Sequence, residues 1–329
     1  MPFERRRLLQ GAAALALGRA AGIAAAQPAS FPSRPIQLVV PNAAGGAADL
    51  TARAVGQRLA AALGQPVVID NRPSAGGVVA GEVVARAEPD GHTLLLISSG
   101  TAVSAALFRK LPFDTLADFA PVSQMARFDL AIAVAANGRF RTLGELLAHA
   151  RANPGKLNIG TPQIGTTQNL AAELFKLSAG IEAQVVPFNG TPPVVTAVRG
   201  GEIDVLVDIL GPLMPHLQGK VLRGLAVLGR ERAPELPDVP AVRESGGPLA
   251  GFDVSSWNGL AAPAKTPPAI VERLSRAVQD AVAQPDVKKQ LQTLNMTARG
   301  SSPAALREFL AADIRRWDEV IAKAKLQKL

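Results

Sequence analysis

The sequence of 329 residues contains no cysteine and only three histidines, His92, His149 and His216. The absence of cysteine excludes disulfide bonds, a thiolate nucleophile and a lipid anchor attached through sulfur. The three histidines lie far apart in the chain, so the ligand spacings of an ordinary zinc site are missing. We therefore expect no metal site.

Motifs that mark the common enzyme classes are also missing. The chain has no Gly-x-Gly-x-x-Gly after a strand, no Gly-x4-Gly-Lys-Ser/Thr, no His-Glu-x-x-His and no Gly-x-Ser-x-Gly. We therefore expect no cofactor. His92 follows the turn Pro89-Asp90-Gly91 and is better placed to open the next strand than to act as a base. An α/β enzyme stays open, although no residue is a candidate for its chemistry.

Positive charge is not gathered on a surface that would bind nucleic acid. The net charge is +8, of which residues 1–26 contribute +3 and residues 265–329 contribute +5, whereas residues 27–264 sum to zero. Aromatic residues make up only 4% of the chain. Because nucleic-acid binding usually needs a basic face with aromatic side chains, we expect no nucleic-acid partner.

The first 26 residues have the pattern of a secretory signal peptide. Arginines 5–7 form a charged start, residues 8–23 are weakly apolar, and alanines 24–26 supply a small-residue cleavage site. A membrane-spanning helix is the alternative, but the apolar run is short and is interrupted by Arg19. We expect a periplasmic mature chain that begins at Gln27. The paired arginines resemble a twin-arginine signal, so the export route stays open.

Short β-branched segments alternate with segments of helical periodicity from residue 36 onward. This alternation predicts βαβ units and a parallel sheet, and the length suggests two domains of about 150 residues. The expected strands cover residues 36–40, 67–70, 93–97, 130–134, 157–160, 183–187, 205–208 and 259–262. The expected helices cover residues 48–61, 77–87, 143–152, 167–179 and 192–199, followed by a helix that is capped by Thr266 and ends at Ala283 and by a last helix that begins at Ser302-Pro303 and packs on the first lobe. Residues 98–129 are expected to form loops, and only a short turn is expected near Leu213.

Two loops between a predicted strand and a predicted helix are candidates for ligand binding. One covers residues 41–49 and includes Gly45, Gly46 and Asp49, and the other covers residues 161–169 and is rich in hydroxyl and amide side chains. Such loops lie at the carboxyl edge of a parallel sheet, where the following helix presents free N–H groups at its positive end. Two helix starts of this kind could hold a small carboxylate without an arginine. The alternative is that the glycines only make tight turns.

Two further polar groups also follow predicted strands. Residues 98–101 add hydroxyl donors at the same sheet edge, and Asp208 ends a strand of its own. Asp208 could accept a hydrogen bond from an amine, an amide or an ordered water, although a solvated loop carboxylate is the alternative.

Several motifs follow one another along the chain in a specific combination. They are Pro41-x-x-x-Gly45-Gly46-x-x-Asp49, Asn71-Arg72-Pro73-Ser74-Ala75-Gly76-Gly77, Pro89-Asp90-Gly91-His92-Thr93-Leu94-Leu95, Phe188-Asn189-Gly190-Thr191-Pro192 and Gly200-Gly201-Glu202-Ile203-Asp204, followed by Asp208. Together they resemble the Bug family, the periplasmic solute-binding proteins of tripartite tricarboxylate transporters. The resemblance covers essentially the whole chain after residue 26.

This resemblance implies a two-lobe α/β periplasmic binding protein of type II, in which each lobe has a mostly parallel sheet flanked by helices. Lobe 1 would comprise residues 27–128 and 251–329, and lobe 2 would comprise residues 129–250. The ligand would bind in the cleft between the lobes, without catalysis. The implied ligand-binding residues are Asn42, Ala43, Ala44, Gly45, Gly46, Asp49, Ser99, Gly100, Thr101, Thr161, Gln163, Gly165, Thr166, Thr167, Gln168, Asn189 and Asp208.

The implied function is capture of a small organic acid, a carboxylate or related amide, and its delivery to the membrane permease subunits by a monomeric protein. A ligand-sensing component of a signalling system is the alternative. Residues 42–44 replace an aromatic residue and prolines that are common in the family, and Asn169 replaces a common histidine. The first loop is therefore smaller and more polar, and the resemblance does not identify the solute.

Overall fold

The structure is a computed structural model and describes residues 31–329. The predicted signal peptide at residues 1–26 lies outside these residues. Within the described part of the chain, no helix combines the length and the apolar character needed to cross a lipid bilayer.

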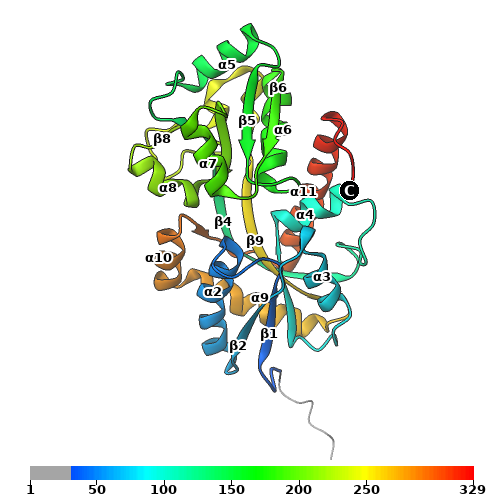
Figure 1. Cartoon of the computed structure of the whole chain (residues 1–329). Coiled ribbons are helices and arrows are strands. Elements are labelled where there is room, and N and C mark those ends of the chain that lie inside the picture. The colour runs from blue at the N-terminus through cyan, green and yellow to red at the C-terminus, as the bar shows by residue number, and fades with distance from the viewer. Residues whose placement is uncertain (1–30) are drawn as a thin grey trace, which may run out of the picture.

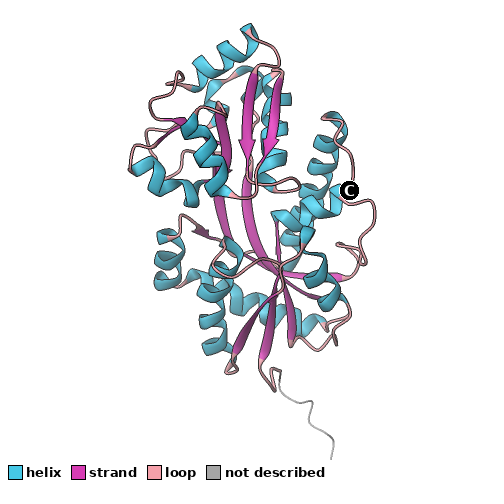
Figure 2. Cartoon of the chain, in the orientation of Figure 1, coloured by secondary structure: helices cyan, strands magenta, loops and turns pink. Residues whose placement is uncertain are grey.

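The described residues form one curved mixed sheet with helices on both faces (Figures 1 and 2). The ten strands along residues 31–329 are β1 (Ile36–Val40), β2 (Val67–Asn71), β3 (Thr93–Ser98), β4 (Phe119–Ala135), β5 (Leu157–Thr161), β6 (Ala183–Pro187), β7 (Val205–Ile209), β8 (Leu222–Val227), β9 (Ser255–Pro263) and β10 (Thr297–Ala298). They follow the order β2-β1-β3-β9-β4-β7-β5-β6, with β8 and β10 paired to β4 outside this path. We call β1, β2, β3, β9, β10 and residues 119–129 of β4 the first half-sheet. Residues 130–135 of β4 with β5, β6, β7 and β8 are the second half-sheet.

The first half-sheet begins with three parallel strands that are connected by helices. Strand β1 (Ile36–Val40) lies between β2 (Val67–Asn71) and β3 (Thr93–Ser98). The connecting helices are α2 (Ala47–Leu63) and α3 (Val78–Ala85), and α2 packs against α9 (Pro268–Ala283) and α10 (Pro285–Thr293). These parallel pairs confirm the predicted βαβ units, and β1 is buried on both faces as parallel strands usually are.

The second half-sheet repeats this arrangement. Strand β5 (Leu157–Thr161) is parallel to β6 (Ala183–Pro187) and to β7 (Val205–Ile209). The helices of this half are α5 (Leu143–Ala152), α6 (Thr167–Ala179), α7 (Thr191–Gly200) and α8 (Leu210–Gln218), and β8 (Leu222–Val227) follows them. The predicted bounds of α6 and β6 are confirmed at both ends.

Two antiparallel strands connect the half-sheets. Strand β4 (Phe119–Ala135) pairs with β9 (Ser255–Pro263) up to Asp129 and with β7 from Leu130 onward. Strand β9 also pairs antiparallel with β3, and the short β10 (Thr297–Ala298) pairs with the same part of β4. The sheet is therefore parallel in its outer strands and antiparallel where the two halves meet.

The structure corrects four details of the sequence prediction. Residues 119–129, which were expected to form a loop, are the first part of strand β4 and pair with β9. Residues 99–107 form helix α4 (Ser99–Leu107) rather than a loop, because the Ser98 hydroxyl accepts from Gly100 N and Thr101 Oγ1 accepts from Ser98 N. The predicted turn near Leu213 is the full helix α8. Thr266 does not cap α9, since Pro267 occupies the cap position and the Thr266 hydroxyl is buried without a partner among the described residues.

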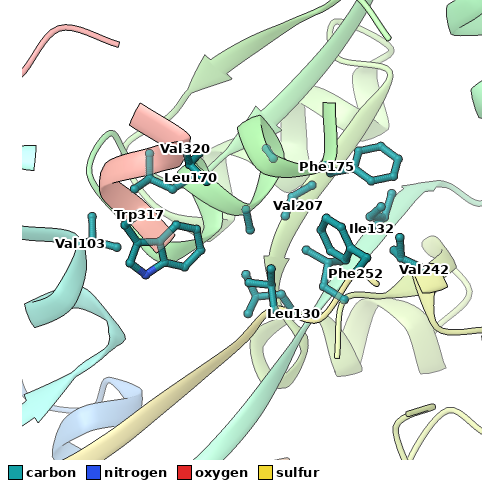
Figure 3. Packing of buried hydrophobic residues seen from close by; sticks show 14 of the residues in the cluster. Val103, Leu130, Ile132, Leu170, Phe175, Val207, Val242, Phe252, Trp317 and Val320 are labelled. Carbon is teal, nitrogen blue, oxygen red and sulfur yellow. The ribbon is translucent and has the colours of Figure 1, made fainter. Parts of the chain in front are cut away.

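The last helix, α11 (Pro303–Lys323), packs on both half-sheets. It was expected on the first lobe and does contact α4 and β4, but it also contacts α6. In Figure 3, Trp317 and Val320 of α11 lie among Val103 of α4 and Leu170 of α6. Trp317 is fully buried in this cluster. One apolar core thus joins the two halves on the side of α11.

Candidate functional site

A cleft of about 670 Å³ is lined by residues of both half-sheets at the carboxyl ends of β1, β3 and β5. This size is within the usual range for small-molecule sites. Among the helices that begin at its wall are α2 and α4, after strands of the first half-sheet, and α6, after a strand of the second. The cap residues of α3 and α8, Gly77 and Ile209, also line the cleft. The cleft is therefore placed where the sequence predicted a binding site.

The first loop is held by a carboxylate from within its own helix. Gly45 has φ of 82°, which glycine adopts without strain, and its N–H donates to Asp49 Oδ2 at 2.9 Å. Arg53 Nε donates to the same oxygen at 2.9 Å. This hydrogen bond from Arg53 is the main cause that lowers the pKa of Asp49. The carboxylate is 2% exposed, so it shapes the loop from behind and does not line the cleft.

Asn71 at the end of β2 makes a second connection to the same loop. Its side-chain amide donates to Asn42 O at 3.1 Å, and its own oxygen accepts from Arg53 Nη2 at 3.4 Å. Arg53 therefore links Asp49 and Asn71, the two side chains that hold opposite ends of residues 42–45. The helix start is left open, because the cap residue Gly46 has no side chain to bond to the first N–H groups of α2.

The second loop is held by hydroxyl groups. The Thr166 hydroxyl accepts from Asn169 N at 3.2 Å as the cap of α6 and donates to Gln163 O at 2.8 Å. Gly165 has φ of 73° and packs directly on α4, since a Cβ at this position would lie 2.9 Å from Leu107 Cδ2. Any other residue here would be strained by the positive φ, and its Cβ would require the Leu107 side chain to shift.

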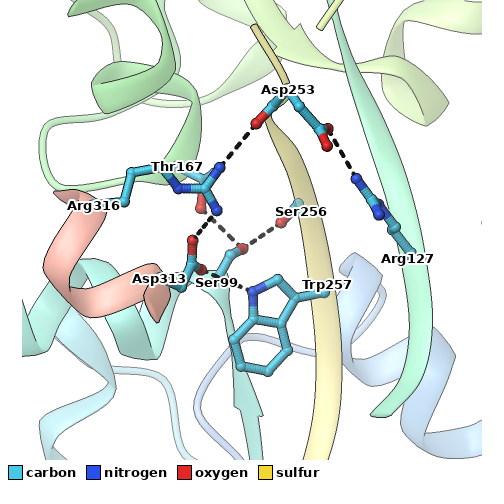
Figure 4. A network of polar contacts seen from close by, with 8 residues as sticks. All are labelled: Ser99, Arg127, Thr167, Asp253, Ser256, Trp257, Asp313 and Arg316. Carbon is cyan, nitrogen blue, oxygen red and sulfur yellow. Dashed lines mark hydrogen bonds and ion pairs between the residues drawn. The ribbon is translucent and has the colours of Figure 1, made fainter. Parts of the chain in front are cut away.

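Buried hydroxyl groups join the two halves at the floor of the cleft. Thr167 Oγ1 of α6 donates to Ser99 Oγ of α4 at 2.9 Å, and Ser99 is also hydrogen-bonded to Ser256 of β9. Figure 4 shows this chain of contacts beside the α11 side chains Asp313 and Arg316. All three hydroxyl residues are at most 5% exposed. The starts of α4 and α6 are thus in direct contact.

The α11 side chains support the strand that carries Ser256. Asp313 is buried and accepts from Trp257 Nε1 at 2.9 Å, while Arg316 donates to Asp253 O at 2.8 Å and also to Asp313. On the opposite side, Arg127 of β4 donates to Asp253 Oδ1 at 3.0 Å. These contacts fix the point at which the chain returns from the second half-sheet to the first (Figure 4).

Four polar predicted residues lie around the cleft without lining it. Thr161 is fully buried and accepts from Asn169 Nδ2, whereas Asn189 is exposed outside the cleft. Asp208 is fully buried and accepts from Thr191 Oγ1, Ile209 N and Gln168 Nε2. Burial raises the pKa of Asp208. Its role in this geometry is to orient Gln168, whereas Asp49 shapes the first loop.

Eleven of the predicted residues do line the cleft, namely Asn42, Ala43, Gly46, Ser99, Gly100, Thr101, Gln163, Gly165, Thr166, Thr167 and Gln168. Ala44 and Gly45 belong to the same loop but do not line the cleft. Ile164 lines the cleft within the predicted loop, although it was not named as a ligand-binding residue. Sequence reasoning missed Ser256 and Asn258 of β9 and the apolar residues Phe108, Leu111, Phe113 and Leu329. Only Ile164, inside a loop that was already predicted, had a local sequence signal.

The cleft wall carries no Asp, Glu, Lys, Arg or His side chain. Each helix N-terminus is equivalent to about half a positive charge, so the starts of α2, α4 and α6 are the main source of positive potential. In the described residues, no group of His, Asp and Glu side chains is arranged to hold a metal ion. The arrangement suits an organic anion of low charge held by N–H and hydroxyl donors.

Comparison with known proteins assigns the family. Residues 51–326 match the model of the tripartite tricarboxylate transporter family receptor. The chain belongs to this family. The protein BugT of Bordetella pertussis is 34% identical over 312 residues, which cover 93% of this chain and 95% of BugT. These receptors bind substrates and are not enzymes, and the predicted Bug-type resemblance is confirmed.

Solved structures of other receptors have the same fold. MatC of Rhodopseudomonas palustris, solved with bound malate, is 34% identical with a TM-score of 0.74 and covers 88% of this chain and 100% of MatC. Another protein of R. palustris, solved with adipate, is 31% identical with a TM-score of 0.79 and covers 91% of this chain and all of that protein. The predicted α/β class and periplasmic binding protein fold are confirmed.

Proposed function

We propose that this receptor captures a small organic carboxylate in the cleft and delivers it to the membrane permease of a tripartite tricarboxylate-type transporter. The observation that carries the proposal is the meeting of three helix starts from both half-sheets at a cleft without charged side chains. A carboxylate bound there accepts hydrogen bonds from the helix N–H groups that have no partner in the short loops. The malate and adipate of the two R. palustris structures belong to the same chemical class.

The receptor acts in the periplasm. This location is supported by the family and by a similar protein described as a periplasmic transporter, which is 32% identical and covers 91% of this chain. Residues 1–26 serve as the export signal, and N-terminal sequencing of the exported protein should begin at Gln27. The exported protein is a monomer that carries one ligand to the permease.

The two lobes of this receptor are residues 27–128 with 251–329, and residues 129–250. The boundary is supported by the change of partners along β4, which leaves β9 at Asp129 and pairs with β7 from Leu130. A ligand that contacts both lobes stabilises the closed arrangement. The stabilisation equals the difference between its binding free energies for the closed and the open form. The permease then recognises the closed form.

The test is calorimetric titration of the protein after co-purified ligand has been removed by reversible unfolding. The panel contains acetate, malate, adipate, benzoate and 3-phenylpropionate, with benzamide as the uncharged comparison. The proposal expects saturable binding of at least one carboxylate, and mass spectrometry should recover it chemically unchanged. The absence of binding by every acid, or conversion of the bound acid to a product, would contradict it.

Delivery is tested by uptake of the bound acid into cells that carry the permease genes. Deletion of the receptor gene should abolish uptake, and the intact gene should restore it. Normal uptake without the receptor, together with loss of a transcriptional response to the acid, would instead indicate a sensing role.

A further inference from the structure

Helix α4 runs from a polar part of the cleft to an apolar part. Gly100, Ser104 and Phe108 are spaced four residues apart and all line the cleft, so one face of the helix follows it. At 1.5 Å per residue, Ser99 and Phe108 are separated by about 13 Å along the helix axis. The polar end of the cleft therefore lies at the starts of α2, α4 and α6, while the other end is lined mainly by apolar side chains.

The apolar end is assembled from three separate segments around the C-terminal end of α4. Phe108, Leu111 and Phe113 come from the segment that follows the helix. Leu329 is fixed beside them, because its N–H donates to Leu107 O at 3.0 Å and its carbonyl accepts from Arg109 N at 2.7 Å. Ile164 reaches the same region from the second half-sheet, since its neighbour Gly165 packs on Leu107.

Two side chains of this apolar end are unusually exposed. Ile164 is 59% exposed and Leu329 is 57% exposed, and no other large apolar side chain of residues 31–329 is as exposed. Both line the cleft. Apolar surface that stays open inside a binding cleft is typical of a site that is completed by an apolar part of the ligand.

The rings of Phe108 and Phe113, which we call the phenylalanine wall, are closely packed against the residues behind them. A Cβ at Gly76 would lie 2.7 Å from Phe108 Cε2, and a Cβ at Gly81 would lie 2.4 Å from the Phe113 ring. Both rings are thus packed directly on glycine backbone, and Phe113 also contacts Phe119 edge-to-face at 5.4 Å between ring centroids. The two rings therefore present a continuous apolar surface to this end of the cleft.

The side chains that line the apolar end offer no charged partner for a second carboxylate. The C-terminal end of α4 carries the negative end of its dipole, which disfavours an anion. Arg109, Lys110 and Lys328 adjoin this end along the chain, but none of them lines the cleft. Arg109 Nε donates to Lys328 O, and Lys328 pairs with Asp318. The side chains that line this end include no cation, so a carboxylate placed there would lose water without gaining a charged partner.

We propose that the ligand of this receptor is a monocarboxylate with an apolar tail. Its carboxylate lies at the helix starts, and its tail, aryl or branched alkyl, covers Ile164, Leu329 and the phenylalanine wall. This inference rests on the proposed function, because it assumes that the carboxylate binds at the same cleft.

The test compares 3-phenylpropionate with adipate and acetate by calorimetry. Burial of a phenyl group favours 3-phenylpropionate over both by about tenfold or more in dissociation constant. Adipate or malate binding as tightly as 3-phenylpropionate would overturn this inference and leave the proposed function standing. Failure of every carboxylate to bind would overturn both.

A matched pair of variants tests whether the apolar tail of the ligand lies against Ile164. Ile164→Lys replaces an exposed apolar side chain in the cleft by a cation, whereas Val68→Lys makes a similar change at a 52% exposed position on β2, outside the cleft. Ile164→Lys should weaken 3-phenylpropionate by about fivefold or more and improve adipate. Val68→Lys should change neither affinity. Equal affinities in the two variants would place the tail elsewhere and overturn the proposal.

Discussion

The two loops that flank the cleft have the same place in the fold but are held by different chemistry. Each follows a parallel strand, contains a glycine with positive φ and precedes a long helix. The loop before α2 depends on the Asp49 carboxylate and on Arg53, whereas the loop before α6 depends on the Thr166 hydroxyl and on packing against α4. The first loop is held by residues of the first half-sheet and its helix α2, whereas the second loop is held partly by α4 of the other half.

This difference indicates a division of roles. The loop before α2 has an uncapped helix start and a network behind it that reaches Asn71, so its N–H groups are fixed and available before a ligand arrives. The start of α6 is already capped by Thr166 and joined to Ser99 through Thr167. We infer that the first loop contributes more of the anion affinity and that the second contributes more to closure.

The largest effect is expected from Asp49→Ala. This change removes the acceptor of the Gly45 N–H and the partner of Arg53, so residues 42–46 lose their fixed shape. Hydrogen bonds to charged groups are worth about 1.5–3 kcal/mol, so affinity for the best panel acid should fall by about 2 kcal/mol, roughly 30-fold. Calorimetry measures the loss.

Asp286→Ala is the control for this change, because Asp286 also pairs with an arginine of α2, Arg58, but is exposed and outside the cleft. It should leave ligand affinity unchanged. If both variants bind as the wild type does, the carboxylate network has no role in shaping the site.

A smaller effect, on the free energy of unfolding, is expected from Asp129 of β4, which lies where the two half-sheets meet. Burial raises the pKa of Asp129 to about 6, with Arg127 opposing and Glu235 and Asp253 adding to the shift. A carboxyl whose pKa is raised on folding lowers stability as pH rises from about 4 through 6, because the folded state then loses a proton it holds more tightly than the unfolded state. Asp129→Asn should therefore stabilise the protein by about 1–2 kcal/mol at pH 7.5, and by less at pH 5.

Urea unfolding at the two pH values measures this difference. The matched comparison is Asp286→Asn, since Arg58 lowers the pKa of Asp286 and the sign of its contribution is opposite. A gain from Asp129→Asn that is the same at pH 5 and pH 7.5 would show that charge burial at the junction is not its cause.

The smallest effect is expected from Thr166→Ala. Loss of a threonine cap costs about 1 kcal/mol of stability, and the loosened loop should weaken ligand binding by roughly fivefold. Thr142→Ala removes the equivalent cap of α5, where Thr142 accepts from Glu145 N at 3.1 Å. Thermal unfolding should give similar losses of stability for both, while calorimetry should show weaker binding for Thr166→Ala alone. Equal affinities would mean that the second loop does not contact the ligand.

The sequence was sufficient to predict the outer strands and the two loops that flank the cleft, because each βαβ unit has a local residue pattern. Apolar runs such as residues 36–40 and glycines before a helix identify the strand, the turn and the helix start together. The predicted start of α6 at Thr167 agrees with the structure for this reason.

The apolar end of the cleft and the antiparallel junction could not be predicted in the same way. Strand β4 contains Pro121, Arg127 and Asp129, so its first part lacks the pattern of a buried strand, and its pairing with β9 joins residues more than 100 positions apart. Helix α4 is rich in Ser, Gly and Ala and has little periodicity, although Ser98 and Thr101 are spaced as a cap. Ser256 and Leu329 come to the cleft only through tertiary structure.

The most direct test is a crystal structure of the protein with the panel acid that binds most tightly. The account predicts a carboxylate within about 3 Å of N–H or hydroxyl donors at the start of α2 or α4 and also of donors at the start of α6, so that both half-sheets hold one anion. A ligand bound outside this cleft, or a carboxylate held by groups of one half-sheet only, would contradict it.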